Sequence, residues 1–219
     1  MAGYKHRLFI FSHTAYLDKI IMAKRSAAEA AETRRNIMDA AERQFAERGF
    51  AATATAEIAK AAKVTEGALF HHFQNKRELF RAVVKKVQDE FHDEIERHAR
   101  NSGSGVDAFR AGARASLNFS QRPAYQKIVL IDAPAVLGTS EWRKIDSALG
   151  LETIAPVLRI LVDKPDLSDD AVMPMAVLVL GFLNETAFAL ARSEKGVTIE
   201  SCMTLLESII GSWIRANRA

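Results

Sequence analysis

Residues 53–76 read TATAEIAKAAKVTEGALFHHFQNK, and this stretch decides the fold. Ile58 and Ala62 are four residues apart, a spacing that places both on one face of a helix. Leu69 and Phe73 repeat the same spacing after a break in the pattern. The stretch therefore predicts two short helices joined by a tight turn, each with its apolar face directed to a shared core.

The second predicted helix begins at Thr65, whose hydroxyl can accept a hydrogen bond from the first free backbone N–H groups. Its outer face carries small and hydrogen-bonding side chains, which suit a helix that enters the major groove of DNA. These outward residues are Thr65, Gly67, Ala68, His71 and His72.

The longer run of residues 49–79 resembles the helix-turn-helix of TetR-like (tetracycline-repressor-like) transcriptional regulators. Their pattern reads roughly Gly-Tyr-x-x-Thr-Thr-x-x-x-Ile-Ala-x-x-Ala-Gly-Val-Ser-x-Gly-x-Leu-Tyr-x-His-Phe-x-x-Lys-x-x-Leu. The matching positions are Gly49, Thr53, Ile58, Ala59, Ala62, Val64, Gly67, Leu69, His72, Phe73, Lys76 and Leu79, with near-matches at Phe50, Thr65 and Phe70.

The resemblance implies an all-α protein with an N-terminal three-helix helix-turn-helix DNA-binding domain and a helical C-terminal domain for ligand binding and dimerisation. It also implies a sequence-specific transcriptional regulator, a dimeric repressor that a small apolar ligand releases from a palindromic operator in double-stranded DNA. The DNA-binding residues expected on this basis are Thr53, Thr55, Thr65, Glu66, Gly67, Ala68, Phe70, His71, His72 and Lys76.

Three positions depart from the family pattern. Lys63 stands where the family usually has glycine at the turn, and a lysine held there in a left-handed conformation costs about 1 kcal/mol. Phe70 replaces a tyrosine whose hydroxyl often reaches a phosphate in the family. Ala54 lacks the hydroxyl of a second threonine. Lys76 falls in the first turn of a helix, where the dipole disfavours a cation, and this indicates a phosphate contact.

The composition is that of an ordinary globular protein. The chain has 219 residues and a net charge of only +3, so DNA binding must come from a local arrangement of charges. The single cysteine, Cys202, excludes an internal disulfide and fits the cytoplasm. No His or Cys cluster has the spacing of a metal site, so we expect neither a metal nor a cofactor.

The first residues of the chain allow two interpretations. The apolar run of residues 8–11 is too short for the core of a signal peptide and far too short to span a bilayer, so we expect no membrane association. Residues 1–21 are either an upstream extension from a misassigned start, with Met22 as the ordinary beginning, or a basic arm that touches DNA. We divide the chain into a partly disordered or artefactual extension (1–30), the DNA-binding domain (31–91) and the effector-binding and dimerisation domain (92–219).

Helical periodicity continues through the rest of the chain, and no alternating strand pattern is present. Helices are predicted over residues 33–47, 76–100, 106–120, 142–161, 171–192 and 200–215, with Gly49 as the stop after the first of these. The helix over 171–192 is apolar almost all round, and the one over 200–215 is amphipathic. Together they predict a homodimer with a four-helix interface.

A pocket is expected between the long helix that begins at Lys76 and the helices around Phe109, Trp142 and Asn184. Such pockets combine apolar walls with a few polar groups that orient the ligand. The candidate effector-binding residues are Phe91, Phe109, Leu117, Asn118, Asp132, Trp142, Val157, Phe182 and Asn184. The apolar runs hold no Arg or Lys, although Lys127 and Arg159 lie at their edges, so a neutral or cationic, partly aromatic ligand is favoured.

Two other functions compete with this one. The first is a DNA-binding regulator that has no small-molecule effector and is controlled by a protein partner. The second is a helical enzyme, because Asp132, Asn184 and Glu185 are polar residues in apolar surroundings. No nucleophile–base pair, metal spacing or phosphate-binding loop accompanies them, so we expect no enzymatic activity.

Overall fold

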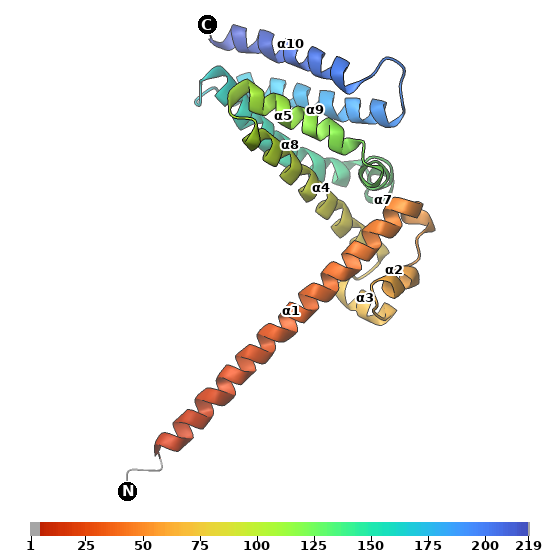
Figure 1. The fold of residues 1–219 in the computed structure, drawn as a ribbon, viewed down its shortest axis with the longest axis vertical. Coiled ribbons are helices and arrows are strands. Elements are labelled where there is room, and N and C mark those ends of the chain that lie inside the picture. Colours follow the sequence, from red (N-terminus) through yellow and green to blue (C-terminus); the bar gives the residue numbers. More distant parts are fainter. Residues whose placement is uncertain (1–4, 219) are drawn as a thin grey trace.

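The computed structural model describes residues 5–218, and it describes their side chains except for residues 5–26 and 146–149. Over this part of the chain every regular element is a helix, so the all-α prediction is confirmed (Figure 1). The elements are α1 (Lys5–Ala52), α2 (Thr55–Ala61), α3 (Glu66–His72), α4 (Lys76–Asn101), α5 (Gly105–Ser120), α6 (Pro123–Tyr125), the π-helix η1 (Gln126–Asp132), α7 (Ala133–Leu137), α8 (Thr139–Val162), α9 (Asp169–Ala191) and α10 (Ile199–Arg218).

The first helix is longer than predicted, since α1 extends beyond both ends of the expected 33–47 segment. The break expected at Gly49 is present, because this residue has non-helical dihedral angles of φ 79° and ψ 168°. The two interpretations of residues 1–21 stay open. Residues 1–4 and the side chains of residues 8–11 lie outside what the structure describes.

The head consists of α2, α3, the end of α1 and the start of α4, which share one apolar core (Figure 1). Phe45, Phe50 and Phe80 meet at its centre, with ring centroids 5.0–5.9 Å apart. Phe50 thereby packs back under α1, as its position after Gly49 predicted. The core is closed, because Phe45, Phe80 and the aliphatic side chains around them are 0% exposed.

Helix α4 connects the head to the rest of the molecule. Its N-cap is Asn75, whose side-chain oxygen accepts a hydrogen bond of 2.9 Å from the backbone N–H of Glu78. Leu79 to Val87 bury their apolar side chains in the head, and the later turns pack along α5. The helix has neither Gly nor Pro, so it forms one rod that spans both regions.

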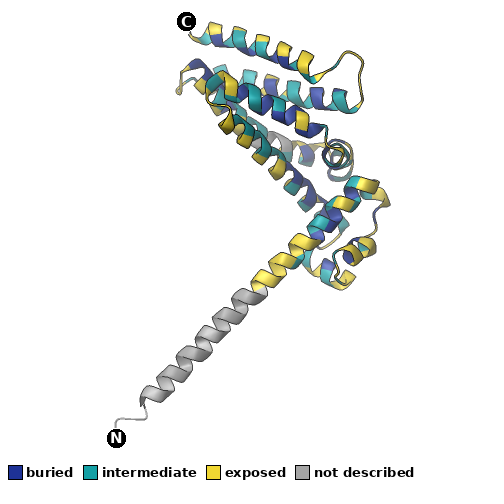
Figure 2. Cartoon of the chain, in the orientation of Figure 1, coloured by how far each residue is buried: buried dark blue, intermediate teal, exposed yellow. Residues whose placement is uncertain are grey.

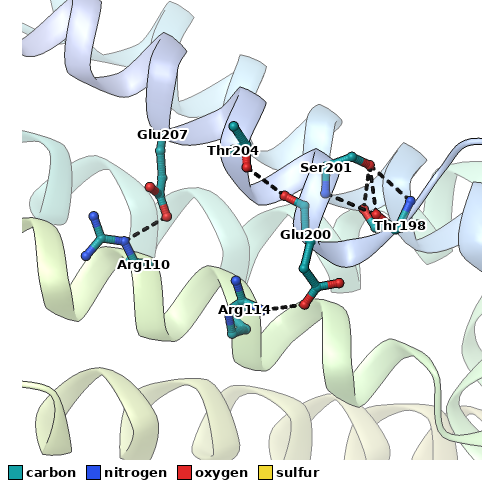
Figure 3. A network of polar contacts seen from close by, with 7 residues as sticks. All are labelled: Arg110, Arg114, Thr198, Glu200, Ser201, Thr204 and Glu207. Carbon is teal, nitrogen blue, oxygen red and sulfur yellow. Dashed lines mark hydrogen bonds and ion pairs between the residues drawn. The ribbon is translucent and has the colours of Figure 1, made fainter.

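In the bundle, α5, α8, α9 and α10 pack around a second apolar core, and the second half of α4 lies along α5. Two ion pairs tie α10 to α5 at its edge: Arg110 with Glu207 at 2.7 Å and Arg114 with Glu200 at 2.9 Å (Figure 3). The start of α10 is capped by Thr198, whose hydroxyl accepts from the backbone N–H of Ser201.

Helix α9 leaves part of its apolar surface uncovered. Val172, Ala176 and Val179 are fully buried in the bundle, whereas Val177 and Leu178 are 55% and 44% exposed. Among the described residues it is the one helix that is long and apolar enough to cross a membrane. Core helices of globular proteins pass the same test of length and composition, so this finding does not by itself indicate insertion.

The segment of α6, η1 and α7 lies between the head and the bundle, where η1 contacts both α1 and α4. We call residues 123–137 the junction segment. Much of this segment is buried (Figure 2). Ile128, Val129 and Ala133 are 0% exposed, whereas Ile131 is 56% exposed. The chain thus inserts a buried π-helix between the two larger units.

Candidate DNA-binding surface and effector cavity

Helix α3 has the features expected of a recognition helix. It begins after Thr65, whose hydroxyl accepts a 3.1 Å hydrogen bond from the backbone N–H of Ala68, as predicted. Leu69 is 0% and Phe73 is 4% exposed, so both belong to the core of the head. The exposed residues on the other side are Thr65, Glu66, Gly67, Phe70 and His71, with Ala68 and His72 half-buried.

The turn before α3 is built on Lys63, whose φ of 58° confirms the predicted left-handed conformation. A hydrogen bond of 3.0 Å from the backbone N–H of Val64 to the carbonyl oxygen of Ala59 closes the turn. Lys60 and Lys63 are both exposed here and add two cations beside the recognition helix. Neither was among the predicted contacts, although their positions next to the turn were a usable signal.

Thr53 was wrongly predicted as a DNA contact. Its side chain is 1% exposed, and its hydroxyl lies 2.8 Å from the carbonyl oxygen of Gly49 and 3.2 Å from that of Gln44. This threonine therefore braces the break in α1. Thr55 points to a different partner, since its hydroxyl donates to the carboxylate of Glu66 at 2.7 Å. This bond joins the starts of α2 and α3, and it holds Glu66 in place.

Lys76 lies beside an aromatic ring. Its ammonium nitrogen is 4.4 Å from the centroid of Phe50, an attractive cation–π geometry. Burial lowers the pKa of Lys76, because the charged form loses water. The ring of Phe50 accepts no conventional hydrogen bond from the ammonium group of Lys76. The N–H groups of this ammonium can therefore donate to a phosphate oxygen. The phosphate contact stays a prediction, and Phe50 is the feature that orients the side chain for it.

A cavity of about 430 Å³ lies in the bundle between α4, α5, α8 and α9. These are the four helices between which the pocket was expected. Four of the predicted residues line it: Phe91, Phe109, Val157 and Asn184. The other lining residues are His92, Asp93, Ile95, Glu96, Ala99, Arg100, Ala108, Gly112, Ala113, Ser116, Gly150, Thr153, Ile154, Val179, Leu180 and Leu183.

The other predicted pocket residues do not line this cavity, because their side chains face another side of their helix or their helix turn lies elsewhere. Leu117 is 1% exposed within the bundle core, and its neighbour Asn118 points to solvent. Trp142 belongs to the core that the head shares with the junction segment. Its ring packs edge-on against that of Phe188, with 6.1 Å between centroids. Phe182 packs against the bundle core without lining the cavity.

Asp132 is the last of these corrections. It lies in the junction segment, where its carboxylate accepts a 2.7 Å hydrogen bond from the backbone N–H of Phe50. Lys127 is its second partner, with 3.6 Å between ammonium nitrogen and carboxylate oxygen. This aspartate therefore connects η1 to the head, and it does not face the cavity.

The walls of the cavity are mostly apolar, and its charged residues are more acidic than basic. Glu96 is paired with Arg100, whereas Asp93 forms no ion pair with any residue that the structure describes. Nδ1 of His92 lies 2.6 Å from the carbonyl oxygen of Gln88, which can only accept, so Nδ1 donates this hydrogen bond. The arrangement therefore suits an apolar molecule that is neutral or positively charged.

The side chains of the described residues contain no cluster of three or more His, Cys, Asp or Glu that could hold a metal ion. The polar groups of the cavity are accordingly hydrogen-bonding and ion-pairing groups around an apolar space. This is the usual construction of a site that binds an organic molecule.

Comparison with known proteins matches both halves of the chain to one family. The description "bacterial regulatory proteins, tetR family" fits residues 37–83, and "tetracyclin repressor-like, C-terminal domain" fits residues 106–212. The regulator TtgR of Pseudomonas putida is 46% identical over 86 residues, which are 39% of this chain and 40% of that protein. The chain is thus aligned with less than half the length of this curated relative.

Solved structures extend the likeness over most of the chain. A TetR-family regulator from Pectobacterium atrosepticum has a TM-score of 0.67 and 28% identity over 87% of this chain and 96% of its own. SmeT, the repressor of a multidrug efflux pump of Stenotrophomonas maltophilia, has a TM-score of 0.59 and 27% identity over 83% of this chain and 91% of its own.

Proposed function

Because the chain belongs to the TetR family of bacterial regulatory proteins, we propose that it is a dimeric repressor released from a palindromic DNA operator by a small apolar ligand. The observation that carries this proposal is one rigid helix, α4, that begins beside the exposed recognition helix and ends along the cavity. Occupation of the cavity can therefore bias the position of the head, which is the requirement for ligand-dependent release.

The DNA-binding domain comprises residues 31–91, and α3 enters the major groove. Thr65, Gly67, Ala68 and His71 lie nearest the bases, and the ammonium of Lys76 binds a phosphate. Phosphate contacts set the position of the helix, and base contacts give the sequence preference. The support is the exposed front of α3 on a closed core, and the position of Lys76 at the start of α4.

The effector and dimerisation domain comprises residues 92–219. The ligand is a neutral or cationic, partly aromatic molecule, since the cavity has aromatic walls and more carboxylates than cations. Dimers form through α9 and α10, which is supported by the exposed Val177 and Leu178 on α9 and Leu205 on α10. SmeT represses a multidrug efflux pump, and that role of a structural relative is consistent with a ligand of this kind.

The alternative is a regulator without a small-molecule effector. The cavity of about 430 Å³ favours the ligand-responsive function, because a bundle without a ligand would gain stability by filling this space. A thermal-shift panel tests the choice. Neutral and cationic aromatic compounds should raise the melting temperature and release operator DNA, and matched aromatic carboxylates should do neither. A compound that stabilises the protein but leaves operator affinity unchanged at saturation argues for the alternative.

The DNA-binding claim is tested with two variants that differ in the kind of contact removed. Footprinting on the protein's own promoter first supplies the operator. His71→Ala should weaken binding to the operator about fivefold to tenfold more than binding to scrambled DNA, because one base contact is lost. Lys76→Ala should weaken both equally and lower the salt slope by about one unit.

Each variant has an outcome that contradicts its assigned role. Equal losses on operator and scrambled DNA would place His71 on the phosphate backbone. An unchanged salt slope would leave Lys76 as a partner of the Phe50 ring alone.

A further inference from the structure

One hydrogen bond joins the junction segment to the head. The carboxylate of Asp132 at the end of η1 accepts from the backbone N–H of Phe50 at 2.7 Å, across 82 residues of sequence. The aspartate side chain is 15% exposed, and Lys127 lies on its other oxygen. The bond is therefore partly buried and directed from one region of the molecule to the other.

The break in α1 creates the need for this acceptor. In a continuous helix the N–H of Phe50 would donate to the carbonyl four residues earlier. Gly49 interrupts the helix with a φ of 79°, so the N–H turns away from that carbonyl and toward η1. A buried N–H without an acceptor is costly, and Asp132 supplies a charged acceptor at this point.

The junction segment packs closely against the break in α1 at Gly49. A side chain at Gly49 would begin 2.6 Å from Cε of Lys127 and 3.0 Å from the bonded carboxylate oxygen of Asp132. Both distances are shorter than ordinary van der Waals contact, so a side chain here would push Lys127 aside and press on the bonded carboxylate, besides being strained at a φ of 79°. The turn that leads into α2 and α3 thus rests directly against η1.

The other end of the junction segment reaches the cavity. Tyr125 precedes η1, and its ring stacks on Phe91 with 5.1 Å between centroids. Phe91 lines the cavity. The π-helix is a rare conformation that is frequently found at functional sites. In this protein, η1 connects Tyr125, which packs on an aromatic wall of the cavity, with Asp132, which binds the backbone of the head.

We propose that Asp132 is a positioning residue for operator binding: through the Phe50 amide it sets the orientation of the head relative to the bundle, without touching DNA. This inference rests on the proposed function for its operator readout. It also predicts a change in the free protein, which can be measured whether or not the operator is known.

The first measurement is the operator affinity of the full-length protein. It is made at a temperature at which each variant is folded, as checked by circular dichroism. Asp132→Ala removes the acceptor and should weaken operator binding about tenfold, as expected for a lost hydrogen bond to a charged group. Asp132→Asn keeps an oxygen acceptor of the same size and should bind within about threefold of wild type. A purely stabilising role would lower the melting temperature of Asp132→Ala and leave the affinity of the folded protein unchanged.

A matched control comes from the α5–α10 edge of the bundle (Figure 3). Glu207 also accepts a 2.7 Å hydrogen bond between distant parts of the chain, from Arg110, but it does not reach the head. Glu207→Ala should therefore leave operator affinity within about twofold of wild type, measured at a protein concentration at which analytical ultracentrifugation shows the variant to be as dimeric as wild type. An equal loss in both variants would show that any weakened contact in the molecule lowers affinity, and it would overturn the inference.

The second measurement needs no DNA. Spin labels at Gln74→Cys and Val106→Cys, with Cys202→Ser, report the distance between head and bundle. The distance distribution should broaden or shift in Asp132→Ala and stay as in wild type in Glu207→Ala. An unchanged distribution in folded Asp132→Ala overturns the inference. A shifted distribution in a protein that binds no operator supports the inference and contradicts the proposed function.

A further variant decides the matter if Asp132→Ala does not fold. Asp132→Glu keeps the charge and the acceptor but lengthens the side chain by one methylene, so it moves the bonded amide and retains the bond. We expect a loss of operator affinity of about fivefold and a shifted label distance. Wild-type affinity together with an unshifted distance in Asp132→Glu would show that the residue does not position the head.

Discussion

The head and the bundle treat their aromatic side chains in opposite ways. In the head, Phe45 and Phe80 are 0% exposed and pack edge-to-face with 5.1 Å between centroids. In the bundle, Phe91 and Phe109 line a cavity of about 430 Å³. At the centre of the head the aromatic rings pack against one another, whereas the bundle leaves a space between four helices.

The same contrast holds at the surface. The large exposed apolar residue of the head is Phe70 on α3, whereas the bundle exposes Ile160, Val177, Leu178 and Leu205. Val177 and Leu178 are consecutive on α9, and an exposed apolar patch usually marks an interaction site. The difference supports the proposal that the bundle takes a ligand between its helices and a second copy against its surface, whereas the core of the head packs without either.

The largest expected effect tests the closed core against the open one. Phe80→Ala should lower the free energy of unfolding by about 3–5 kcal/mol, because the site is fully packed. Phe91→Ala should lower the free energy of unfolding by about 1–2 kcal/mol less than Phe80→Ala does, because the ring of Phe91 already borders the cavity. Urea unfolding at one fixed protein concentration measures both. Equal costs would remove the distinction between the two cores.

The second prediction tests the uncovered face of α9. Val177→Glu with Leu178→Glu should raise the dimer dissociation constant at least about 100-fold, since two carboxylates would lose water in an apolar interface. Analytical ultracentrifugation at micromolar concentration should show monomers. Val106→Glu on α5, also an exposed valine, should leave the dimer intact. A double variant that stays dimeric would place the interface elsewhere.

Val179 and Phe182, which also lie on α9, are unsuitable for this test. Val179 is 0% exposed within a single protomer, and Phe182 packs against the same core. A charge at either position would disrupt the bundle itself, and the loss of dimer would then have no simple meaning.

The smallest expected effect concerns the polar contact that fastens α4 to α1 in the head. The ammonium of Lys86 lies 2.7 Å from carboxylate oxygens of both Asp39 and Glu42. Burial opposes this charge, but the hydrogen bonds to the two carboxylates outweigh it and raise the pKa of Lys86. Lys86→Met should therefore lower the free energy of unfolding by about 1–2 kcal/mol.

The sign of the pKa change fixes the pH range of this effect. A lysine with a raised pKa in the folded state contributes fully below its unfolded pKa of about 10.4 and loses its contribution as the pH rises further. The difference between wild type and Lys86→Met should be constant from about pH 7 to pH 9 and shrink above about pH 10.4. Lys85→Met, which removes only an exposed pair with Asp89, should change stability by under about 1 kcal/mol. A difference that grows in alkaline solution would contradict the assignment.

The head was largely predictable from the sequence, because its signals are local. The cap at Thr65, the inward spacing of Leu69 and Phe73, the left-handed Lys63 and the stop at Gly49 each depend on a few neighbouring residues. Thr53 was missed because its partners are the carbonyl oxygens of Gly49 and Gln44. No pattern of side chains records where a carbonyl will point once a helix breaks.

The cavity was predictable in its location but not in its residues. Helical periodicity predicted the helices, and the family resemblance implied a pocket among them. Phe91, Phe109, Val157 and Asn184 do line the cavity. Which neighbour along a helix faces the space depends on rotations of a few tens of degrees, so Asn118 and Phe182 were misplaced. Asp132 and Trp142 were assigned to the cavity for a different reason. A polar or aromatic residue among apolar ones is equally typical of a ligand site and of a contact between two regions, and the sequence does not distinguish the two.

The left-handed Lys63 carries a consequence for the search along the chromosome. Glycine would adopt the same turn without strain, so the lysine keeps a positive charge at this position at the expense of stability. Attraction to phosphates is independent of sequence and lets a protein slide along DNA between encounters with its target. Lys63 precedes the N-cap Thr65 of the proposed recognition helix, so under the proposed function its charge would hold α3 near the phosphates of non-operator DNA. In that case the strained turn would exchange folding stability for a longer residence on DNA, and a longer residence shortens the search for the operator.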